Sequence, residues 1–114
     1  MMHKLDINDV MKAICDEFHV AEAAIVSRVR VEPVTDARKA LSLIMYYLGG
    51  WPVEKIAGKI RRKVGAINGY KRSARDLFKY DRLFKWRFER CMSSLDFDDE
   101  FIKQFIRNLI NDKI

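Results

Sequence analysis

Residues 53–77 read VEKIAGKIRRKVGAINGYKRSARDL, and they are the most informative part of the sequence about the fold class. Apolar residues recur at helical spacing, which predicts a short helix over Val53–Ile60 and a longer one over Lys63–Lys79. The Arg61-Arg62 pair leaves room for only a tight turn between them. A short helix, a tight turn and a second, basic helix are the parts of a helix-turn-helix.

The longer helix carries two glycines, each of which costs about 1 kcal/mol relative to alanine in a helix interior. On a helical wheel, Gly65 and Gly69 fall on or beside a polar stripe, opposite the apolar residues. Small residues on a basic face let a helix backbone approach base edges in a major groove. The alternative is that they let another helix of the protein pack closely. The stripe contains Arg61, Gly65, Asn68, Arg72, Arg75 and Lys79, and the opposite side contains Val64, Ile67, Ala74, Leu77 and Phe78.

Helical periodicity continues through the rest of the chain, and no strand pattern or internal repeat is visible. We expect Asp6 or Asn8 to cap the first helix, Thr35 to cap the third, and the acidic SLDFDDE segment to cap the last. The prediction is an all-α, compact bundle of six or seven helices. The remaining helices are expected over Ile7–Phe18, Ala21–Val26, Asp36–Leu48, Arg82–Ser93 and Asp98–Asn111.

The charge is unevenly distributed along the 114 residues. The net charge is +6, yet residues 28–90 hold 17 Lys or Arg against six acidic residues, between two acidic ends. A basic middle segment favours a polyanion-binding surface. The alternative is a solvated basic face that serves solubility.

Several function classes find no support in the sequence. Cys15 and Cys91 follow no disulfide or metal spacing, which favours buried thiols in a reducing, cytoplasmic compartment. No apolar run approaches the roughly 20 residues of a membrane span, and the N-terminus lacks the apolar stretch of a signal peptide. No nucleophile with a base, no paired catalytic carboxylates and no phosphate-binding GxxxxGK[ST] loop occurs. We therefore expect no enzymatic activity, cofactor, metal, small-molecule substrate or membrane contact.

Four segments resemble the C-terminal DNA-binding domain of the bacterial replication initiator DnaA. They are VMKAICDEFHVAEAAIVS, SRVRVEPVTDARKALSLIMYYL, VEKIAGKIRRKVGAINGYKRSARDL and KYDRLFKWRFERCMSSL, in the order of the family's parts. The resemblance implies a Trp-repressor-like helical bundle that binds double-stranded DNA. It places Arg30 at the family's minor-groove position, Arg38 at an arginine that starts the long helix, and Arg62 at the signature arginine of the major-groove helix.

The chain departs from the family at the signature itself. The family reads roughly Arg-Asp-His-Thr-Thr-Val where this chain has RKVGAI, and the turn before Arg62 is one residue shorter and lacks paired glycines. Base readout then shifts to the remaining polar residues, to thymine-methyl contacts or to DNA shape. The predicted DNA-binding residues are Arg28, Arg30, Arg38, Arg61, Arg62, Lys63, Gly65, Ala66, Asn68, Gly69 and Arg72.

The function predicted from sequence is a stand-alone regulator of transcription or replication, for example of a mobile element. The alternative is an inhibitor or interaction module that kept the fold and binds an acidic protein. Residues 1–95 form the DnaA-like domain, and the helix in residues 96–114 either packs on it or forms a homodimer surface. The aromatic and basic segment LFKYDRLFKWRFERC suggests RNA stacking, but we expect Leu83, Trp86 and Phe88 to be buried in the bundle.

Overall fold

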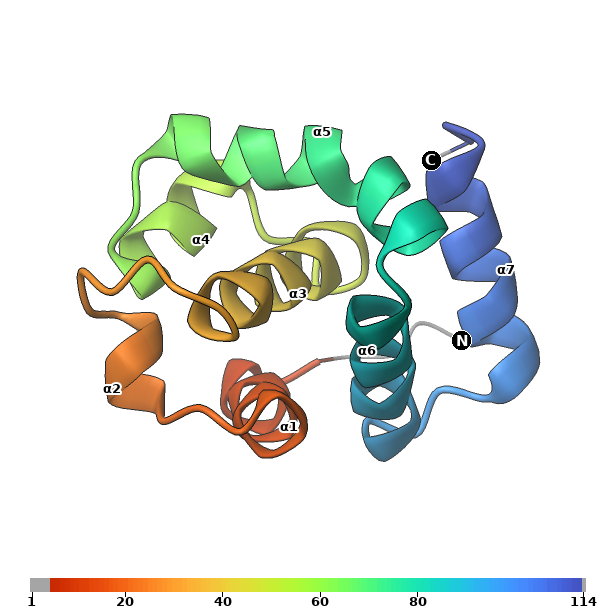
Figure 1. Cartoon of the computed structure of the whole chain (residues 1–114), viewed down its shortest axis with the longest axis horizontal. Coiled ribbons are helices and arrows are strands. Elements are labelled where there is room, and N and C mark those ends of the chain that lie inside the picture. Colours follow the sequence, from red (N-terminus) through yellow and green to blue (C-terminus); the bar gives the residue numbers. More distant parts are fainter. Residues whose placement is uncertain (1–4, 114) are drawn as a thin grey trace.

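The computed structural model describes residues 5–113. Within this range the chain forms seven α-helices and no strand, which confirms the predicted all-α class (Figure 1). No helix among these residues is long and apolar enough to cross a membrane. The helices are α1 (Ile7–Phe18), α2 (Glu22–Ile25), α3 (Val34–Tyr47), α4 (Val53–Ile60), α5 (Val64–Tyr80), α6 (Arg82–Ser94) and α7 (Asp99–Ile110).

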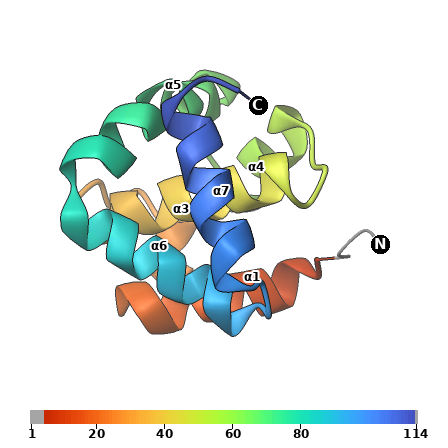
Figure 2. The same ribbon diagram turned by 90° about the vertical axis from the view of Figure 1, so that its right-hand side faces the viewer.

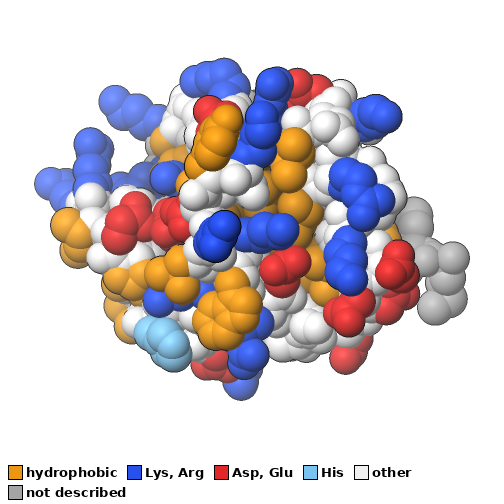
Figure 3. All heavy atoms as spheres, turned by 45° about the vertical axis from the view of Figure 1, so that its right-hand side comes forward, with side chains coloured by type: hydrophobic (Ala, Val, Ile, Leu, Met, Phe, Trp, Pro, Cys, Tyr) orange, Lys and Arg blue, Asp and Glu red, His pale blue; other side chains and the backbone are white. Residues whose placement is uncertain are grey.

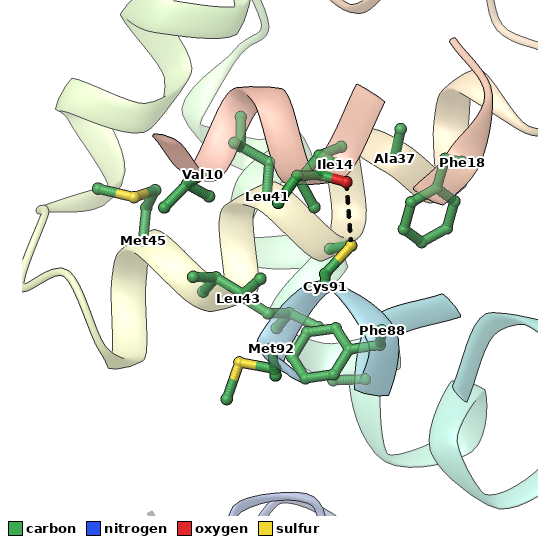
Figure 4. Packing of buried hydrophobic residues seen from close by; sticks show 14 of the residues in the cluster. Val10, Ile14, Phe18, Ala37, Leu41, Leu43, Met45, Phe88, Cys91 and Met92 are labelled. Carbon is green, nitrogen blue, oxygen red and sulfur yellow. Dashed lines mark hydrogen bonds between the residues drawn. The ribbon is translucent and has the colours of Figure 1, made fainter. Parts of the chain in front are cut away.

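Helix α3 forms the centre of the bundle. It contacts α1, α2, α4 and α5, and most of its residues are buried. In Figure 1, α5 runs along one side of α3 while α1 lies on the other, and α6 and α7 close one end. Figure 4 shows side chains of α1, α3 and α6 pointing towards one another, with Ile14, Leu41 and Phe88 among them. This tightly packed and largely apolar interior holds α5 along one edge of the molecule.

Side-chain caps mark where three of the helices, α1, α6 and α7, begin. The side chain of Asp6 accepts a hydrogen bond from the Asn8 N–H, and that of Asp98 accepts one from the Phe101 N–H, as the sequence predicts. Thr35, in contrast, is not a cap. α3 begins one residue earlier, at Val34, and the Thr35 hydroxyl donates to the Glu32 carboxylate instead.

Helix α7 packs on the bundle (Figure 2). It lies against α5 and α6, and the ring of Phe105 stacks 6.1 Å from that of Phe88. Four of its apolar residues are buried, namely Ile102, Phe105, Ile106 and Leu109. Each contributes about 1.5–3 kcal/mol of hydrophobic free energy, so this stripe stabilises the fold as it stands. A homodimer formed through α7 remains a prediction.

The two cysteines differ in burial. Cys91 is buried and its Sγ donates a hydrogen bond of 3.6 Å to the Ala13 carbonyl, which Figure 4 marks by a dashed line. Cys15 is partly buried, and burial raises the pKa of both thiols. Both cysteines are free.

Two residues of α6 contradict the expectation that this segment is buried. Phe88 lies in the core as predicted, but Leu83 and Trp86 are each 54% exposed. The reason is the helical period, since the buried side of α6 carries Phe84, Phe88 and Met92, and Trp86 points the opposite way.

Candidate nucleic-acid interface

The α4–turn–α5 unit has the predicted helix-turn-helix arrangement. Arg61 follows the last residue of α4 as its C-cap and adopts the left-handed conformation with φ 56° and ψ 49°. Only Arg61, Arg62 and Lys63 separate the two helices, and the Arg62 N–H bonds back to the Ala57 carbonyl at 2.9 Å. Glycine usually occupies such a left-handed position, so Arg61 is held there at a cost of about 1 kcal/mol. Arg61 therefore belongs to the turn and not to the stripe of α5 on which the helical wheel placed it.

The two glycines of α5 have open space beside them. A Cβ atom added to Gly65 would meet nothing within 4 Å, and one added to Gly69 would meet only the Arg72 guanidinium at 3.8 Å. No helix of the described chain packs against either glycine, so the helix-packing interpretation is wrong within the chain. The backbone of α5 is free to approach an external partner here.

Arg38 does not belong to the surface, although the resemblance placed it among the DNA-binding residues. It is 1% exposed, and its guanidinium donates hydrogen bonds to four backbone carbonyls of the α2–α3 region. Its Nε donates to Ile25 at 2.8 Å, while its Nη atoms donate to Ala24 at 3.0 Å, to Ser27 at 2.9 Å and to Val29. Burial, and then the neighbouring positive charge of Arg62, lower the pKa of Arg38. We therefore assign Arg38 a structural role, because it holds the loop between α2 and α3 in place.

Arg62 holds the same loop from the other side. Its Nη2 donates to the Ser27 carbonyl and, at 3.4 Å, to the Val29 carbonyl, both of which Arg38 also contacts. These bonds connect the turn of the helix-turn-helix to the α2–α3 loop. The carbonyls of residues 27 and 29 therefore face the protein, whereas Arg28 and Arg30 are exposed.

Most of the predicted interface residues do come together on one side of the protein. The loop and the α4–α5 turn lie next to each other at one end of the molecule in Figure 1, joined by the Arg62 bonds. Arg61, Lys63, Gly65 and Arg72 are exposed, and Ala66, Asn68 and Gly69 are half-buried on α5.

The cations of this surface form no ion pair with any acidic side chain that the structure describes. The ion pairs of the described chain join Lys12 to Asp16, Lys39 to Asp36, Arg75 to Asp112 and Arg90 to Glu17, all elsewhere. We call the unpaired group the cation cluster. It comprises Arg28, Arg30, Arg61, Arg62, Lys63 and Arg72.

Exposed valines lie among these cations. Val29 is 42% exposed, Val31 62% and Val64 37%. The sequence placed Val64 on the buried side of α5, and this is wrong because it is the first residue of that helix, where the chain has just left the bundle. A methyl-bearing residue at this position suits contact with thymine methyl groups.

The loop ends at a pair of carboxyl groups. Asp36 shares a hydrogen bond with Glu32, and burial together with the Glu32 charge raises the pKa of Asp36 to about 7. Burial opposes the ionisation of Glu32, but hydrogen bonds from Asp36 and Thr35 outweigh it and lower the pKa of Glu32. Lys39, 3.9 Å from Asp36, favours the charged form of both carboxyls, and Asp81 disfavours that of Asp36. The proton that the pair retains near neutrality therefore resides on Asp36.

Residues 5–113 offer no ready metal centre, because no group of three or more His, Cys, Asp or Glu side chains converges. Comparison with protein-family models, curated proteins and solved structures finds no match to this chain. The resemblance to the DnaA domain therefore remains a prediction based on the four segments quoted above.

Sequence reasoning missed Ser27 as a part of this site. Its carbonyl receives hydrogen bonds from Arg38 and Arg62, and its hydroxyl accepts one from the Val29 N–H at 3.1 Å. A serine that bonds the backbone two residues ahead forms a local turn, and serine before a basic stretch is the only signal for it in the sequence.

Proposed function

We propose that this chain binds double-stranded DNA, with α5 in the major groove and the loop of residues 27–31 in the neighbouring minor groove. The observation that carries the proposal is the cation cluster, whose members form no ion pair with a carboxylate among residues 5–113. A concentration of uncompensated cations on a helix-turn-helix attracts a polyanion.

The start of α5 suits a phosphate. Lys63 occupies its N-cap position without making a side-chain cap, and the first turn contains no acidic residue. The free N–H groups and the positive end of the helix dipole therefore face solvent beside Arg61 and Lys63. These groups would set the register of the protein on the backbone, which positions it but does not read sequence.

The next turn of α5 would read bases. Asn68 has the amide that can pair with adenine, and Val64 can contact thymine methyl groups. Gly65 and Gly69 have open space where a side chain would begin, so that the helix backbone can lie deep in the groove, and Ala66 between them adds only a methyl group. Arg72, one turn further on, would contact the guanine edge or the phosphate.

Arg28 and Arg30 would enter the minor groove. Their loop is anchored through its carbonyls by Arg38 and Arg62, so both side chains extend from a fixed backbone. Arginine is favoured in narrow minor grooves because the negative potential is strongest there. This role agrees with the position that the DnaA resemblance gives to Arg30.

We further propose that the protein acts in the cytoplasm as a regulator of transcription or replication, for example of a mobile element. The free thiols of Cys15 and Cys91 are consistent with a reducing compartment. The DnaA resemblance supports a replication or transcription context but does not choose between them.

The test is a selection from random duplex DNA at about 150 mM salt, where nonspecific electrostatic binding is weak. We expect an enriched motif, and a palindromic one would add support for a homodimer. With about five phosphate contacts, log K should fall with log salt at a slope of about −4 to −5.

Two double variants each remove two positive charges, one pair from the proposed interface and one pair from a distant surface as a control. Arg28→Ala with Arg30→Ala should weaken binding to the selected duplex, while Lys103→Ala with Lys113→Ala on the opposite part of the chain should not. If both pairs weaken binding equally, the docking arrangement is wrong. If no duplex is retained at all, the cation cluster serves an acidic protein instead.

A further inference from the structure

Two valines are exposed on the loop that carries the minor-groove arginines. Residues 27–31 read SRVRV, so that positively charged and apolar side chains alternate. Val29 and Val31, together with Val64 at the start of α5, are the exposed valines of the described chain. A single exposed valine needs no explanation, but all three lie within or beside the cation cluster. Figure 3 shows Lys and Arg side chains at the left edge of the molecule, where the loop lies in Figure 1, with hydrophobic side chains beside them.

The backbone that carries these valines is held in place. The Val29 carbonyl accepts a hydrogen bond from Arg38, and the Val29 N–H donates one of 3.1 Å to the Ser27 hydroxyl. The Val31 carbonyl accepts one of 3.2 Å from the Thr35 N–H, in the first turn of α3. The valine side chain itself is stiff, because it is branched at Cβ. A partner that covers these methyl groups therefore orders little that is not already ordered.

The charge around the valines favours a groove lined with phosphates. Residues 27–31 contain two Arg and no Asp or Glu. The next residue is Glu32, and its carboxylate accepts a hydrogen bond from the Thr35 hydroxyl, which ties it to the start of α3. Neither Arg28 nor Arg30 forms an ion pair with a carboxylate of residues 5–113. A DNA groove would therefore meet two unpaired guanidinium groups with methyl groups between and beside them.

Base pairs differ in the minor groove by a single group. A·T and T·A pairs present only acceptors there, whereas a G·C pair adds the guanine N2 amino group as a donor. Adenine has only its C2 hydrogen at the same place. A methyl group packed against guanine would occupy the space of the amino group and offer it no acceptor. Burying a donor without an acceptor weakens binding about tenfold, whereas the same methyl group packs against adenine C2 without this loss.

We propose that Val29 and Val31 make the loop selective for A·T over G·C pairs in the minor groove, with their methyl groups against the adenine C2 edge. This inference rests on the proposed binding of DNA, and it assigns the base preference at the loop to two uncharged residues. Arg28 and Arg30 respond to the width and the negative potential of the groove. Each methyl group responds instead to one base edge.

The test is a scan of the duplex that the selection enriches, using the full chain. Each A·T pair is replaced in turn by inosine·C or by G·C, and fluorescence anisotropy gives the affinities. Inosine is guanine without the N2 amino group, so the two replacements are identical in the major groove and differ only in the minor groove. At a pair that α5 reads, both replacements should weaken binding equally.

The loop should give a different result about five base pairs away, which is half a helical turn. There we expect inosine·C to bind within about twofold of A·T, because both lack the amino group. G·C at the same positions should bind about tenfold more weakly.

Matched variants assign this difference to the valines. Val29→Thr with Val31→Thr keeps the shape of both side chains but replaces a methyl group of each with a hydroxyl that can accept from the guanine amino group. In this variant the tenfold difference between inosine·C and G·C should shrink to about twofold or less. Val64→Thr makes the same chemical change on α5 and should leave that difference unchanged. All three positions are exposed, so each variant should melt close to the parent protein.

Two results would overturn the role of the valines while DNA binding stands. The first is that inosine·C and G·C bind alike at every position, so that no base pair is read through the guanine amino group. The second is that the difference persists when both loop valines are threonine, which would leave the preference to the arginines and the groove width. If the chain retains no duplex at all, the DNA proposal fails, and this inference fails with it.

Discussion

Arg62 is expected to act on DNA mainly through the loop that it holds. Replacing it with alanine removes the bond to the Ser27 carbonyl and the longer, 3.4 Å contact to Val29. Arg38 keeps both carbonyls bonded, so no buried acceptor is left without a donor. The cost in stability should therefore lie at the low end for such bonds, at about 1 kcal/mol.

This perturbation has a readout that needs no DNA. Trypsin cuts after Arg28 and Arg30, and loosening the loop by about 1 kcal/mol raises the open population about fivefold. Arg62→Ala should accelerate cleavage at these two sites by that factor. Arg72→Ala, which removes an exposed charge from α5 without touching the loop, should leave the cleavage rate there unchanged.

A double-mutant cycle then tests the link to binding. If Arg62 positions Arg30, the losses of DNA affinity in Arg62→Ala and Arg30→Ala should overlap, with a coupling energy of about 0.5–1.5 kcal/mol. Fluorescence anisotropy with the selected duplex gives the four affinities. If the two losses of DNA affinity are strictly additive and trypsin cleavage is unchanged, the reasoning is refuted. Arg62 would then contribute to binding by contacting DNA directly.

Three further variants test other parts of the structure. Arg38→Met should cost about 3 kcal/mol in chemical unfolding, because the buried Ile25 carbonyl would be left without its donor and the bonds to the Ala24, Ser27 and Val29 carbonyls would be lost as well. Gly69→Ala should stabilise α5 by up to about 1 kcal/mol yet weaken duplex binding. If the variant is more stable and also binds the duplex more tightly, DNA does not use the open backbone at this position. Asp36→Asn should raise the free energy of unfolding at pH 8 and leave it nearly unchanged at pH 3. The sign follows because a carboxyl with a raised pKa is stabilising when protonated, and its contribution is lost as pH rises from the unfolded value of 3.8 to about 7. Solvent screening of this half-exposed pair reduces the effect to about 1 kcal/mol, and thermal melts at the two pH values measure it.

The helices were predictable because their signals are local. The apolar period and the caps at Asp6 and Asp98 lie within a few residues of the structure they specify. Thr35 failed as a cap because threonine has an equally local alternative, and here its hydroxyl bonds to Glu32. Whether Thr35 caps the helix or bonds to Glu32 depends on the path of the preceding loop, and the apolar period of the sequence does not describe that path.

The placement of the arginines was not predictable in the same way. Arg38 and its acceptors are separated by 9 to 14 residues, and Arg62 is 35 residues from Ser27. Composition favours an exposed position for every arginine, since charged residues are almost never fully buried unless paired. Backbone carbonyls are the partners here, and they leave no trace in the sequence. Leu83 and Trp86 show the reverse error, because apolar residues were assumed to face the core.

The glycines of α5 connect the fold to the proposed function. A glycine in a helix costs free energy, and close packing of another helix is one way in which a protein offsets that cost. Here no part of the described chain comes within 4 Å of the position a Cβ would take at Gly65, and only Arg72 does so at Gly69. The free-energy cost of these glycines is therefore either compensated by a partner outside the chain or not compensated at all. The unpaired cations beside these glycines favour an external polyanion, because a helix that carries fixed positive charge and an uncovered backbone on one face gains most where phosphates flank a groove.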